Sequence, residues 1–270
     1  MDEIKNIGFG NGKVYALKTS SGKIVETTDT FLPLYTKTCV RECNTLIKDD
    51  FGSRSDRWMI GVSVMSGCLV GCKFCATGTV FNGNLTSEEI IEQVEFIIRK
   101  NTHNKPQDSD EFKILLTRMG EPALNYKEVN KAIIFIKEKY PFAIISISTI
   151  GIDNLALLTW LALYKKYKGI ELQFSIHTTS KEDRKKLIPM ADLEFVHMRE
   201  FGKRWVNVGE DRNRKITLNF TLTEGNEFDI KVLRTYFPKE HFFIKLTPLN
   251  NNKISIKNNL NGIIKKQNIM

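Results

Sequence analysis

The sequence has little of what a secreted or membrane-spanning protein requires. It contains only five cysteines in 270 residues, and an odd number argues against a framework of disulfide bonds. No apolar run approaches the roughly 20 residues of a membrane span. Residues 1–5 lack the charged and then apolar order of a signal sequence. We therefore expect a cytoplasmic protein with reduced cysteines and no membrane partner.

Cysteine is absent after Cys75, although three cysteines lie close together before that point. Cys68, Cys72 and Cys75 form a Cys-x3-Cys-x2-Cys motif. Structural zinc sites need four protein ligands, and ferredoxin-type clusters need four cysteines. No fourth cysteine or histidine lies near Cys75, and His103 is the closest candidate downstream. The motif therefore favours a [4Fe–4S] cluster with one iron that has no protein ligand.

An iron without a protein ligand can bind the amino and carboxylate groups of S-adenosylmethionine (SAM) and pass one electron to its sulfonium. That cleavage yields a 5′-deoxyadenosyl radical. The motif resembles the signature of radical SAM enzymes, with Phe74 in the aromatic position before the last cysteine. This chemistry implies an electron donor such as flavodoxin or ferredoxin.

The net charge of +9 leaves two interpretations open. Positive side chains gather in residues 251–270 and in residues 199–215, where six Lys or Arg face three acids. Such a balance can bind the phosphates of a nucleotide or an RNA. A composition rich in lysine and asparagine gives the same charge without any such partner.

Apolar strand-like runs alternate with amphipathic helical patterns from about Cys68 onward. Six such repeats with short connections predict a parallel sheet with right-handed crossovers. Six repeats rather than eight indicate an α/β fold with a partial (β/α)6 barrel. The expected strands are Met59–Met65, Lys113–Thr117, Ala143–Ser148, Glu171–Ile176, Lys215–Leu222 and Phe242–Leu246. The expected helices are one that begins with a capping box at Thr86 and Glu89, then Tyr126–Tyr140, Asn154–Tyr164, Lys181–Leu187 and Asp229–Tyr236.

The segment before the barrel has a different pattern. Two alternating runs, Lys13–Thr19 and Lys23–Thr28, flank the turn residues Ser20, Ser21 and Gly22, which predicts a β-hairpin. We therefore expect a small N-terminal β-hairpin extension with its connecting segment over 1–58, a barrel over 59–250 and a basic tail over 251–270.

Polar residues follow five of the six expected strands, where α/β barrels carry their chemistry. The cysteine loop follows the first strand, Gly120 and Glu121 follow the second, Ser148 ends the third, Ser175 and His177 end the fourth, and Asn250 follows the sixth. Because the carboxyl ends of parallel strands share one edge, we expect these residues to line one mouth together with the cysteines.

Each of these residues could bind SAM or take part in the reaction, and each could instead have only a structural role. Glu121 could accept the amino group of SAM, and Ser148, Ser175 or Asn250 could bind its ribose. His177 could hold the cofactor or exchange protons, since the ordinary pKa of histidine lies near neutrality; it could also be a packed ring. Phe74 could pack against the adenine or only anchor the loop. The candidate catalytic residues are His177 and Asn250.

At this point the chain resembles one family, the dual-cysteine 23S rRNA adenine methyltransferases, which include the chloramphenicol–florfenicol resistance methyltransferase. The resemblance implies a partial barrel, a [4Fe–4S] cluster on the three cysteines, and SAM contacts at Glu121, Ser148, Ser175, His177 and Asn250. The matching stretches run in order over about residues 12–250 and include Ser66–Cys68, Cys75–Gly78, Asn84–Ile90, Met119–Pro122, Ser148–Gly151, Phe174–His177, Arg184–Pro189, Arg214–Thr217 and Pro248–Asn250.

The chain departs from that family where the methyl group is transferred. The family uses two further cysteines, one seven residues before the cluster motif and one near the C-terminus. Gly61 occupies the first position, and no cysteine follows Cys75. We also expect the family's helical N-terminal RNA-binding domain to be missing. Cys39 and Cys43 could replace the missing thiols, or they could be ordinary reduced thiols.

Three functions remain open from the sequence. The first is a radical SAM enzyme that abstracts hydrogen from a nucleoside, a nucleotide or a small molecule. The second is an RNA modifier that uses Cys39, Cys43 or a thiol of a partner protein. The third is a SAM- or RNA-binding regulator without activity, against which the intact cysteine motif and the Gly120–Pro122 turn argue. Specificity is expected from residues 39–58, the loop after Cys75, residues 190–213 and the basic tail, none of which carries a substrate signature.

Overall fold

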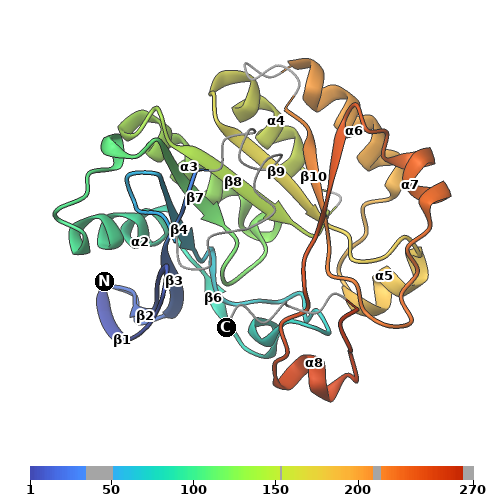
Figure 1. Ribbon diagram of the computed structural model, residues 1–270, viewed down its shortest axis with the longest axis horizontal. Helices are drawn as coiled ribbons and strands as arrows, with labels where there is room; N and C mark the ends of the chain where they lie inside the picture. The colour runs from blue at the N-terminus through green and yellow to red at the C-terminus, as the bar shows by residue number, and fades with distance from the viewer. Residues whose placement is uncertain (35–50, 153, 209–213, 264–270) are drawn as a thin grey trace.

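One sheet of nine strands combines an antiparallel part with a parallel part (Figure 1). The computed structural model describes residues 1–34, 51–152, 154–208 and 214–263. The strand order is β1-β2-β3-β4-β7-β8-β9-β10-β11. The strands are β1 (Asp2–Phe9), β2 (Gly12–Lys18), β3 (Ile24–Leu32), β4 (Arg57–Val62), β7 (Glu111–Leu116), β8 (Ile144–Thr149), β9 (Ile170–Ser175), β10 (Ile216–Phe220) and β11 (Phe242–Leu246).

The last six strands are parallel, as the repeating pattern predicts. β4, β7, β8, β9, β10 and β11 pair with their neighbours in that order. Helices on the outer side of the curved sheet connect them (Figure 1). They are α2 (Ser87–Lys100), α3 (Tyr126–Lys139), α4 (Ala156–Lys166), α5 (Lys181–Leu187), α6 (Phe195–Val208) and α7 (Ile230–Tyr236). This arrangement confirms the α/β partial barrel of six strands.

The first barrel strand ends earlier than the sequence predicts. β4 stops at Val62, and the backbone N–H of Ser63 donates to the buried side chain of Gln93 in α2 at 2.8 Å. The chain then leaves the main sheet. Residues Met65–Gly67 form β5, which pairs with β6 (Phe81–Asn84) in a separate two-stranded sheet. This second sheet frames the loop that carries the cysteines.

The N-terminal strands continue the barrel sheet. β2 and β3 form the predicted antiparallel hairpin, and β1, which the sequence pattern does not predict, pairs antiparallel with β2. β3 in turn pairs antiparallel with β4, placing Thr28 opposite Gly61. The boundary expected after residue 58 therefore falls inside β4, and the extension is a three-stranded continuation of the sheet.

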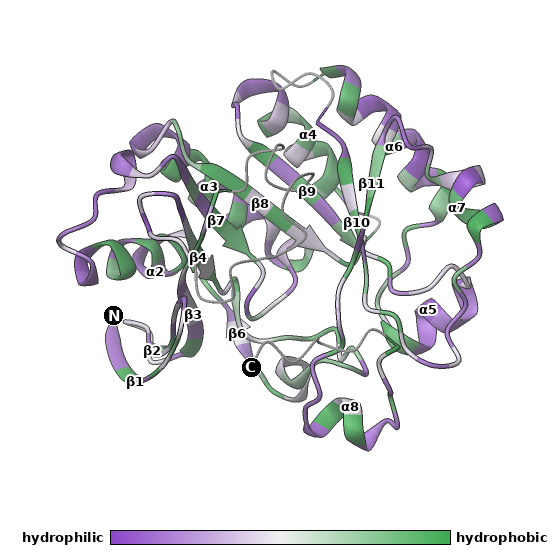
Figure 2. Ribbon diagram, viewed as in Figure 1, coloured by the Kyte–Doolittle hydropathy of each residue, from purple (hydrophilic) through white to green (hydrophobic). Residues whose placement is uncertain are grey.

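The parallel strands alternate between two different environments. On β7 the side chains of Phe112, Ile114 and Leu116 are buried, whereas Lys113 and Leu115 between them are only half-buried. β8 and β9 alternate in the same way. Figure 2 shows hydrophobic residues gathered in the central strands and in α4, and hydrophilic residues on the outside of α5 and α6. The core therefore lies between sheet and helices, and side chains do not fill the concave side as they do in a closed eight-stranded barrel.

A buried carboxylate joins the N-terminal strands to the barrel. Asp29 on β3 is 1% exposed. It accepts hydrogen bonds from Arg54 at 2.7 and 3.1 Å, from the Trp58 indole at 2.8 Å and from the Asn101 side chain at 3.0 Å. These donors come from the segment before β4, from β4 itself and from the end of α2. One side chain thus connects four parts of the chain.

Replacing Asp29 by alanine is expected to lower the free energy of unfolding by about 3 kcal/mol or more. The substitution leaves the Arg54 charge and the buried indole N–H without their acceptor, and breaking a buried pair is costly. Urea unfolding followed by circular dichroism measures the change. Asp2→Ala, on an exposed part of β1, serves as the control and should change the value by less than about 0.5 kcal/mol. Equal stability of the Asp29→Ala variant and the unmutated chain would contradict this role.

Candidate active site

A cavity of about 200 Å³ lies at the carboxyl ends of the strands, under the cysteine loop. It brings together every candidate site residue predicted from the sequence except Asn250. Thr117, Arg118 and Thr149, which the sequence pattern does not single out, also line it. The predicted members of the lining are Cys68, Cys72, Phe74, Cys75, Gly120, Glu121, Ser148, Ser175 and His177. We call this space the active-site cavity.

Backbone hydrogen bonds from two directions anchor the cysteine loop. The N–H of Cys68 donates to the Val80 carbonyl at 3.0 Å, beside β6. The N–H of Lys73 donates to the carbonyl of Leu187, at the end of α5, at 2.9 Å. All three cysteines are free thiols of intermediate exposure. The loop therefore presents three thiols to one cavity from a fixed backbone.

The segment after Asn250 supports this loop from the other side. Residues Lys253–Lys257 form a short helix, α8, which the sequence pattern does not predict. Its N-cap residue Asn252 donates to the carbonyl of Phe74 at 2.9 Å, and Asn258 donates to the carbonyl of Lys73 at 3.0 Å. Part of the expected basic tail is thus a brace for the cluster loop. The signal in the sequence is the capping box formed by Asn252 and Ser255.

Asn250 itself does not line the active-site cavity. Its side chain is exposed, and its backbone carbonyl accepts a hydrogen bond from Asn252 at 3.1 Å. Asn250 lies two residues before Asn252, whose side chain donates to the carbonyl of Phe74. Its expected contact with SAM remains a prediction.

Burial and neighbouring negative charges act on the thiols of Cys68 and Cys72. Burial, and after it the charges of Glu121 and Cys75, raises the pKa of Cys68 to about 11. Burial and the neighbouring thiols raise the pKa of Cys72 further. Three thiolates there need a cationic group to stabilise them. Among the described residues no three His, Cys, Asp or Glu side chains converge on one metal ion. The thiols can instead each bind a different iron of one cluster.

Glu121 lies buried between the ends of β7 and β8. Its carboxylate accepts hydrogen bonds from the N–H groups of Ala123 and Ile150, both at 2.9 Å, and from the hydroxyl of Thr149. Burial raises the pKa of Glu121 to about 7, although these hydrogen bonds act in the opposite direction. A cation placed beside the carboxylate favours its charged form. The site can therefore receive an ammonium group.

The glycine before it makes this position possible. Gly120 has a φ of +102°, and a Cβ atom there would lie 2.7 Å from the side chain of Met65. A larger residue would therefore be strained in its backbone and would also collide with the start of β5. The Gly-Glu-Pro turn holds Glu121 where the loop and the strand ends meet.

His177 is buried and neutral. Its Nδ1 accepts a hydrogen bond from the N–H of Thr221 at 2.9 Å, and its ring meets that of Phe74 edge-on, with centroids 4.6 Å apart. Burial, with a smaller effect of Arg184, lowers the pKa of His177 to about 3. The ordinary pKa of histidine therefore does not hold at this position, and the catalytic role expected of His177 remains a prediction. Since Nδ1 accepts, the neutral ring carries its hydrogen on Nε2 and can donate it to a ligand.

Two further side chains hold the strand ends in place. Gln173 donates to the hydroxyl of Ser148 at 2.9 Å, which joins β9 to β8. Arg184 is 4% exposed and donates to the carbonyls of Ile150 and, at 3.3 Å, Leu193. Periodicity gives no sign of either role, because both depend on contacts between distant segments.

The hydroxyl of Thr28 and the side chain of Arg118 crowd the position where the resembling family carries a relay cysteine. A Cβ atom at Gly61 would lie 2.3 Å from the hydroxyl of Thr28 and 3.1 Å from Cδ of Arg118. Arg118 lines the active-site cavity and forms an ion pair with Glu26 of β3. A side chain at position 61 would need both neighbours to move. Cys39 and Cys43 lie outside the described residues.

A family model described as the radical SAM superfamily matches residues 62–197, about half of the chain. The chain belongs to the radical SAM superfamily. The cofactors of a radical SAM enzyme are a [4Fe–4S] cluster and SAM, and such an enzyme needs a reductant and a substrate. Cys68, Cys72 and Cys75 are the candidate cluster ligands of the chain. In the part of the chain that the structure describes, no helix is long and apolar enough to span a membrane.

Curated radical SAM relatives are longer than this chain. It is 31% identical over 227 residues to a protein named "Probable dual-specificity RNA methyltransferase RlmN" from Dictyoglomus turgidum, a match that covers 82% of this chain and 56% of the relative. A relative of the same name from Dictyoglomus thermophilum is 33% identical over 192 residues, which is 69% of this chain and 47% of the relative. The chain thus spans about half the length of these relatives.

Solved radical SAM structures share the fold. A radical SAM methyltransferase from Sphaerobacter thermophilus aligns with a TM-score of 0.69 at 22% identity, covering 92% of this chain and 67% of its own. This similarity extends over nearly the whole chain and so includes the N-terminal strands as well as the barrel.

Replacing Cys68, Cys72 or Cys75 by alanine, one at a time, is expected to abolish cluster assembly. After anaerobic reconstitution, iron analysis should find about four irons per unmutated chain and fewer than about one in each variant. The matched controls are Cys39→Ala and Cys43→Ala, which should keep the full iron content. Loss of iron in either control equal to that in Cys68→Ala would mean that the cluster has other ligands.

Proposed function

We propose that this radical SAM enzyme cleaves SAM reductively and uses the resulting radical to abstract a hydrogen atom from a nucleoside, a nucleotide or another small molecule. The observation that carries this proposal is the relay position. Gly61 has no thiol, and the side chains of Thr28 and Arg118 crowd the space beside it. Among the 270 residues no cysteine follows Cys75. A methyl relay through two cysteines therefore lacks the thiol that the family carries before its cluster motif.

The residues of the active-site cavity would bind and orient the cofactor. When bound, the cluster would supply the electron for the reductive cleavage of SAM. Glu121 would accept the amino group of SAM with a carboxylate that three hydrogen bonds hold in place. Ser148 and Ser175 would bind the ribose.

The aromatic side of the cavity would hold the adenosine. Phe74 would pack against the adenine, held in its own position by the edge-on His177 ring. His177 would donate a hydrogen bond through Nε2, because its Nδ1 is already occupied by Thr221. We propose that His177, as a neutral ring, binds the cofactor rather than transferring a proton.

The electron would come from a small redox protein such as flavodoxin or ferredoxin. The three thiols are partly exposed, so a donor can approach the cluster from the loop side. We also propose a cytoplasmic location, where reduced thiols and an oxygen-sensitive cluster persist.

RNA modification is the second candidate, and the names of the curated relatives favour it, since they are called RNA methyltransferases. In this chain the reaction would need Cys39, Cys43 or a thiol of a partner protein to carry the methyl group. The excess of positive charge, +9, is compatible with an RNA partner.

The products formed from SAM separate the two candidates. The reconstituted chain, incubated anaerobically with SAM and dithionite, is expected to release 5′-deoxyadenosine and no S-adenosylhomocysteine, because no relay thiol accepts a methyl group. Liquid chromatography with mass spectrometry quantifies both. S-adenosylhomocysteine formed in amounts comparable to 5′-deoxyadenosine would contradict the first candidate. Its loss in a Cys39→Ala/Cys43→Ala variant would then establish the second.

The pH dependence of SAM binding tests the role of Glu121. The carboxyl has a pKa of about 7 without ligand and must be ionised to accept an ammonium group. Equilibrium dialysis should therefore show the dissociation constant rising as the pH falls below about 7, by up to about tenfold per pH unit. The Glu121→Gln variant should bind SAM more weakly and with a flat profile over this range. The same pH dependence in both proteins would rule out this role.

A further inference from the structure

The cysteine loop and α8 form one face of the molecule that carries positive charge and no acid of its own. α8 lies at the same end of the molecule as β6, the strand that frames the loop (Figure 1). Residues 57–87 and 241–270 contain no Asp or Glu, although the chain has 31 acids. Lys73, Lys253 and Lys257 are exposed there. We call the surface formed by the exposed side chains of residues 68–81 and 253–257 the cluster face.

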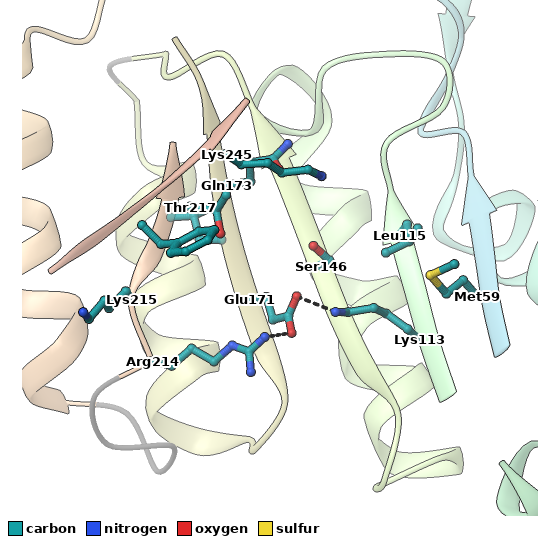
Figure 3. A pocket seen from close by; sticks show the side chains of 12 residues that line it. Met59, Lys113, Leu115, Ser146, Glu171, Gln173, Arg214, Lys215, Thr217 and Lys245 are labelled. Atoms are coloured by element: carbon teal, nitrogen blue, oxygen red, sulfur yellow. Dashed lines mark hydrogen bonds and ion pairs between the residues drawn. The ribbon is translucent and has the colours of Figure 1, made fainter. Parts of the chain in front are cut away.

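The lysines of the cluster face lack the partners that compensate positive charge elsewhere. None of the three forms an ion pair with any residue that the structure describes. By contrast, Lys113 and Arg214 on the concave side of the sheet both pair with Glu171 (Figure 3). The charge of those two residues is therefore partly cancelled within the protein, and that of the cluster face is open to a partner.

Two acids from other segments border the cluster face. Asp183 lies with Lys73 along a cavity between α5 and the end of α8, and it pairs with Lys186 at 3.1 Å. Glu224 lies beyond α8, where it accepts a hydrogen bond from Asn261 at 3.1 Å. Neither carboxylate pairs with a lysine of the cluster face, which therefore keeps an excess of positive charge.

Apolar side chains are interleaved with these lysines. Lys253, Ile256 and Lys257 stand at positions i, i+3 and i+4 of α8 and so share one side of the helix. Ile256 is 65% exposed, and at the loop Leu69 and Val80 are 52% and 55% exposed. Apolar side chains among positive ones fit a protein partner that has an apolar patch with an acidic rim.

α8 also contacts the stretch of the loop between two of the cysteines. The cap residues at its two ends donate to the backbone carbonyls of Phe74 and Lys73, at 2.9 and 3.0 Å. These two residues separate Cys72 from Cys75, which are candidate cluster ligands and partly exposed. A protein bound to α8 therefore lies close to the place where an electron has to enter.

We propose that the cluster face is the docking surface for an electron-donor protein with an acidic surface. In the electron transfer the donor is oxidised by one electron and the cluster is reduced by one, and no bond forms or breaks. The need for such a donor rests on the proposed function. A nucleic acid fits the face less well, because its single strands stack on aromatic side chains, whereas Leu69, Val80 and Ile256 are aliphatic.

Binding of a flavodoxin with a net negative charge to the reconstituted full chain, measured by surface plasmon resonance without SAM, tests the surface. The dissociation constant should rise at least about tenfold between about 0.01 M and about 0.1 M salt, because the Debye length shortens from about 30 Å to about 10 Å. Lys253→Glu/Lys257→Glu should weaken binding at low salt at least about tenfold, because like charges would then meet.

A matched control has the same change of charge at the same spacing. Lys127→Glu/Lys131→Glu, at exposed positions of α3, should bind flavodoxin as the unmutated chain does. All three proteins should contain the same amount of iron after reconstitution. If the Lys253→Glu/Lys257→Glu variant contains less, Lys253→Gln/Lys257→Gln takes its place and should weaken binding about threefold or more.

Cross-linking with a carbodiimide then locates the partner, because this reagent joins a lysine to a carboxylate in direct contact. Mass spectrometry should find flavodoxin linked to Lys73, Lys253 or Lys257. Cross-links confined to other lysines would overturn the proposal. So would equal binding by the unmutated chain and the variants of α8, or the failure of both flavodoxin and an acidic ferredoxin to bind.

A short single-stranded RNA is the probe for the other occupant. RNA binding that is lost in Lys253→Glu/Lys257→Glu while flavodoxin binding is unchanged would assign the face to nucleic acid and overturn the proposal. None of these measurements requires SAM cleavage. Failure of the docking proposal is therefore distinguishable from failure of the proposed function, which the products formed from SAM with dithionite report.

Discussion

The hydrogen bonds to Glu121 hold together the part of the molecule on which the site depends. One carboxylate joins the turn after β7 to the end of β8 through Ala123, Thr149 and Ile150. Because the carboxyl of Glu121 is buried, its ionisation is costly, and its pKa is raised to about 7. Near neutral pH both its charged and its uncharged form are therefore populated. The same group therefore joins the strand ends, and a cationic ligand bound beside it would favour its charged form.

The cysteine loop rests on this edge and is supported independently of it. The end of α5 holds Lys73 from one side, and the α8 segment holds Phe74 and Lys73 from the other through Asn252 and Asn258. Segments separated by well over a hundred residues in the sequence thus converge on the loop. The strand ends and the loop form a rigid cradle, which is what a cluster with only three protein ligands requires.

The concave side of the sheet, which side chains fill only in part, is the second feature on which the site depends. A sheet of six parallel strands does not close, so the inward side chains cannot fill the interior as they do in eight-stranded barrels. The alternation of buried and half-buried residues along β7, β8 and β9 follows directly from this. The active-site cavity is part of this concave surface at the carboxyl ends of the strands. A second hollow, lined among others by Lys113, Glu171 and Arg214, lies toward their amino ends (Figure 3).

Strong periodic patterns predicted most of the fold. Apolar runs gave the six parallel strands, and the Thr86–Glu89 capping box gave the start of α2, which the structure confirms. The helix α6 was missed although Phe195, Met198, Phe201 and Trp205 recur at helical spacing. Gly202 within α6 lowers the helix propensity of this segment. Tertiary packing requires the glycine, because a Cβ atom there would lie 2.2 Å from the Phe242 ring.

The site was predictable as a set of residues but not in its electrostatics. Parallel strands must end at one edge, so residues at strand ends had to meet there. The low pKa of His177 and the raised pKa of Glu121 arise from burial, which spacing along the chain does not report. The position of Asn250 outside the active-site cavity depends on how the chain turns into α8. The contacts of Gly61 with Thr28 and Arg118 depend on the pairing of β4 with β3 and with β7.

The electron paramagnetic resonance spectrum of the reconstituted and reduced chain, recorded with and without SAM, tests the central claim most directly. The claim is that three thiols hold a [4Fe–4S] cluster and leave one iron open to SAM. We expect the signal of a reduced cluster whose g values change when SAM is added. A cluster signal that is identical with and without SAM, or the absence of any cluster signal after reconstitution, would contradict it.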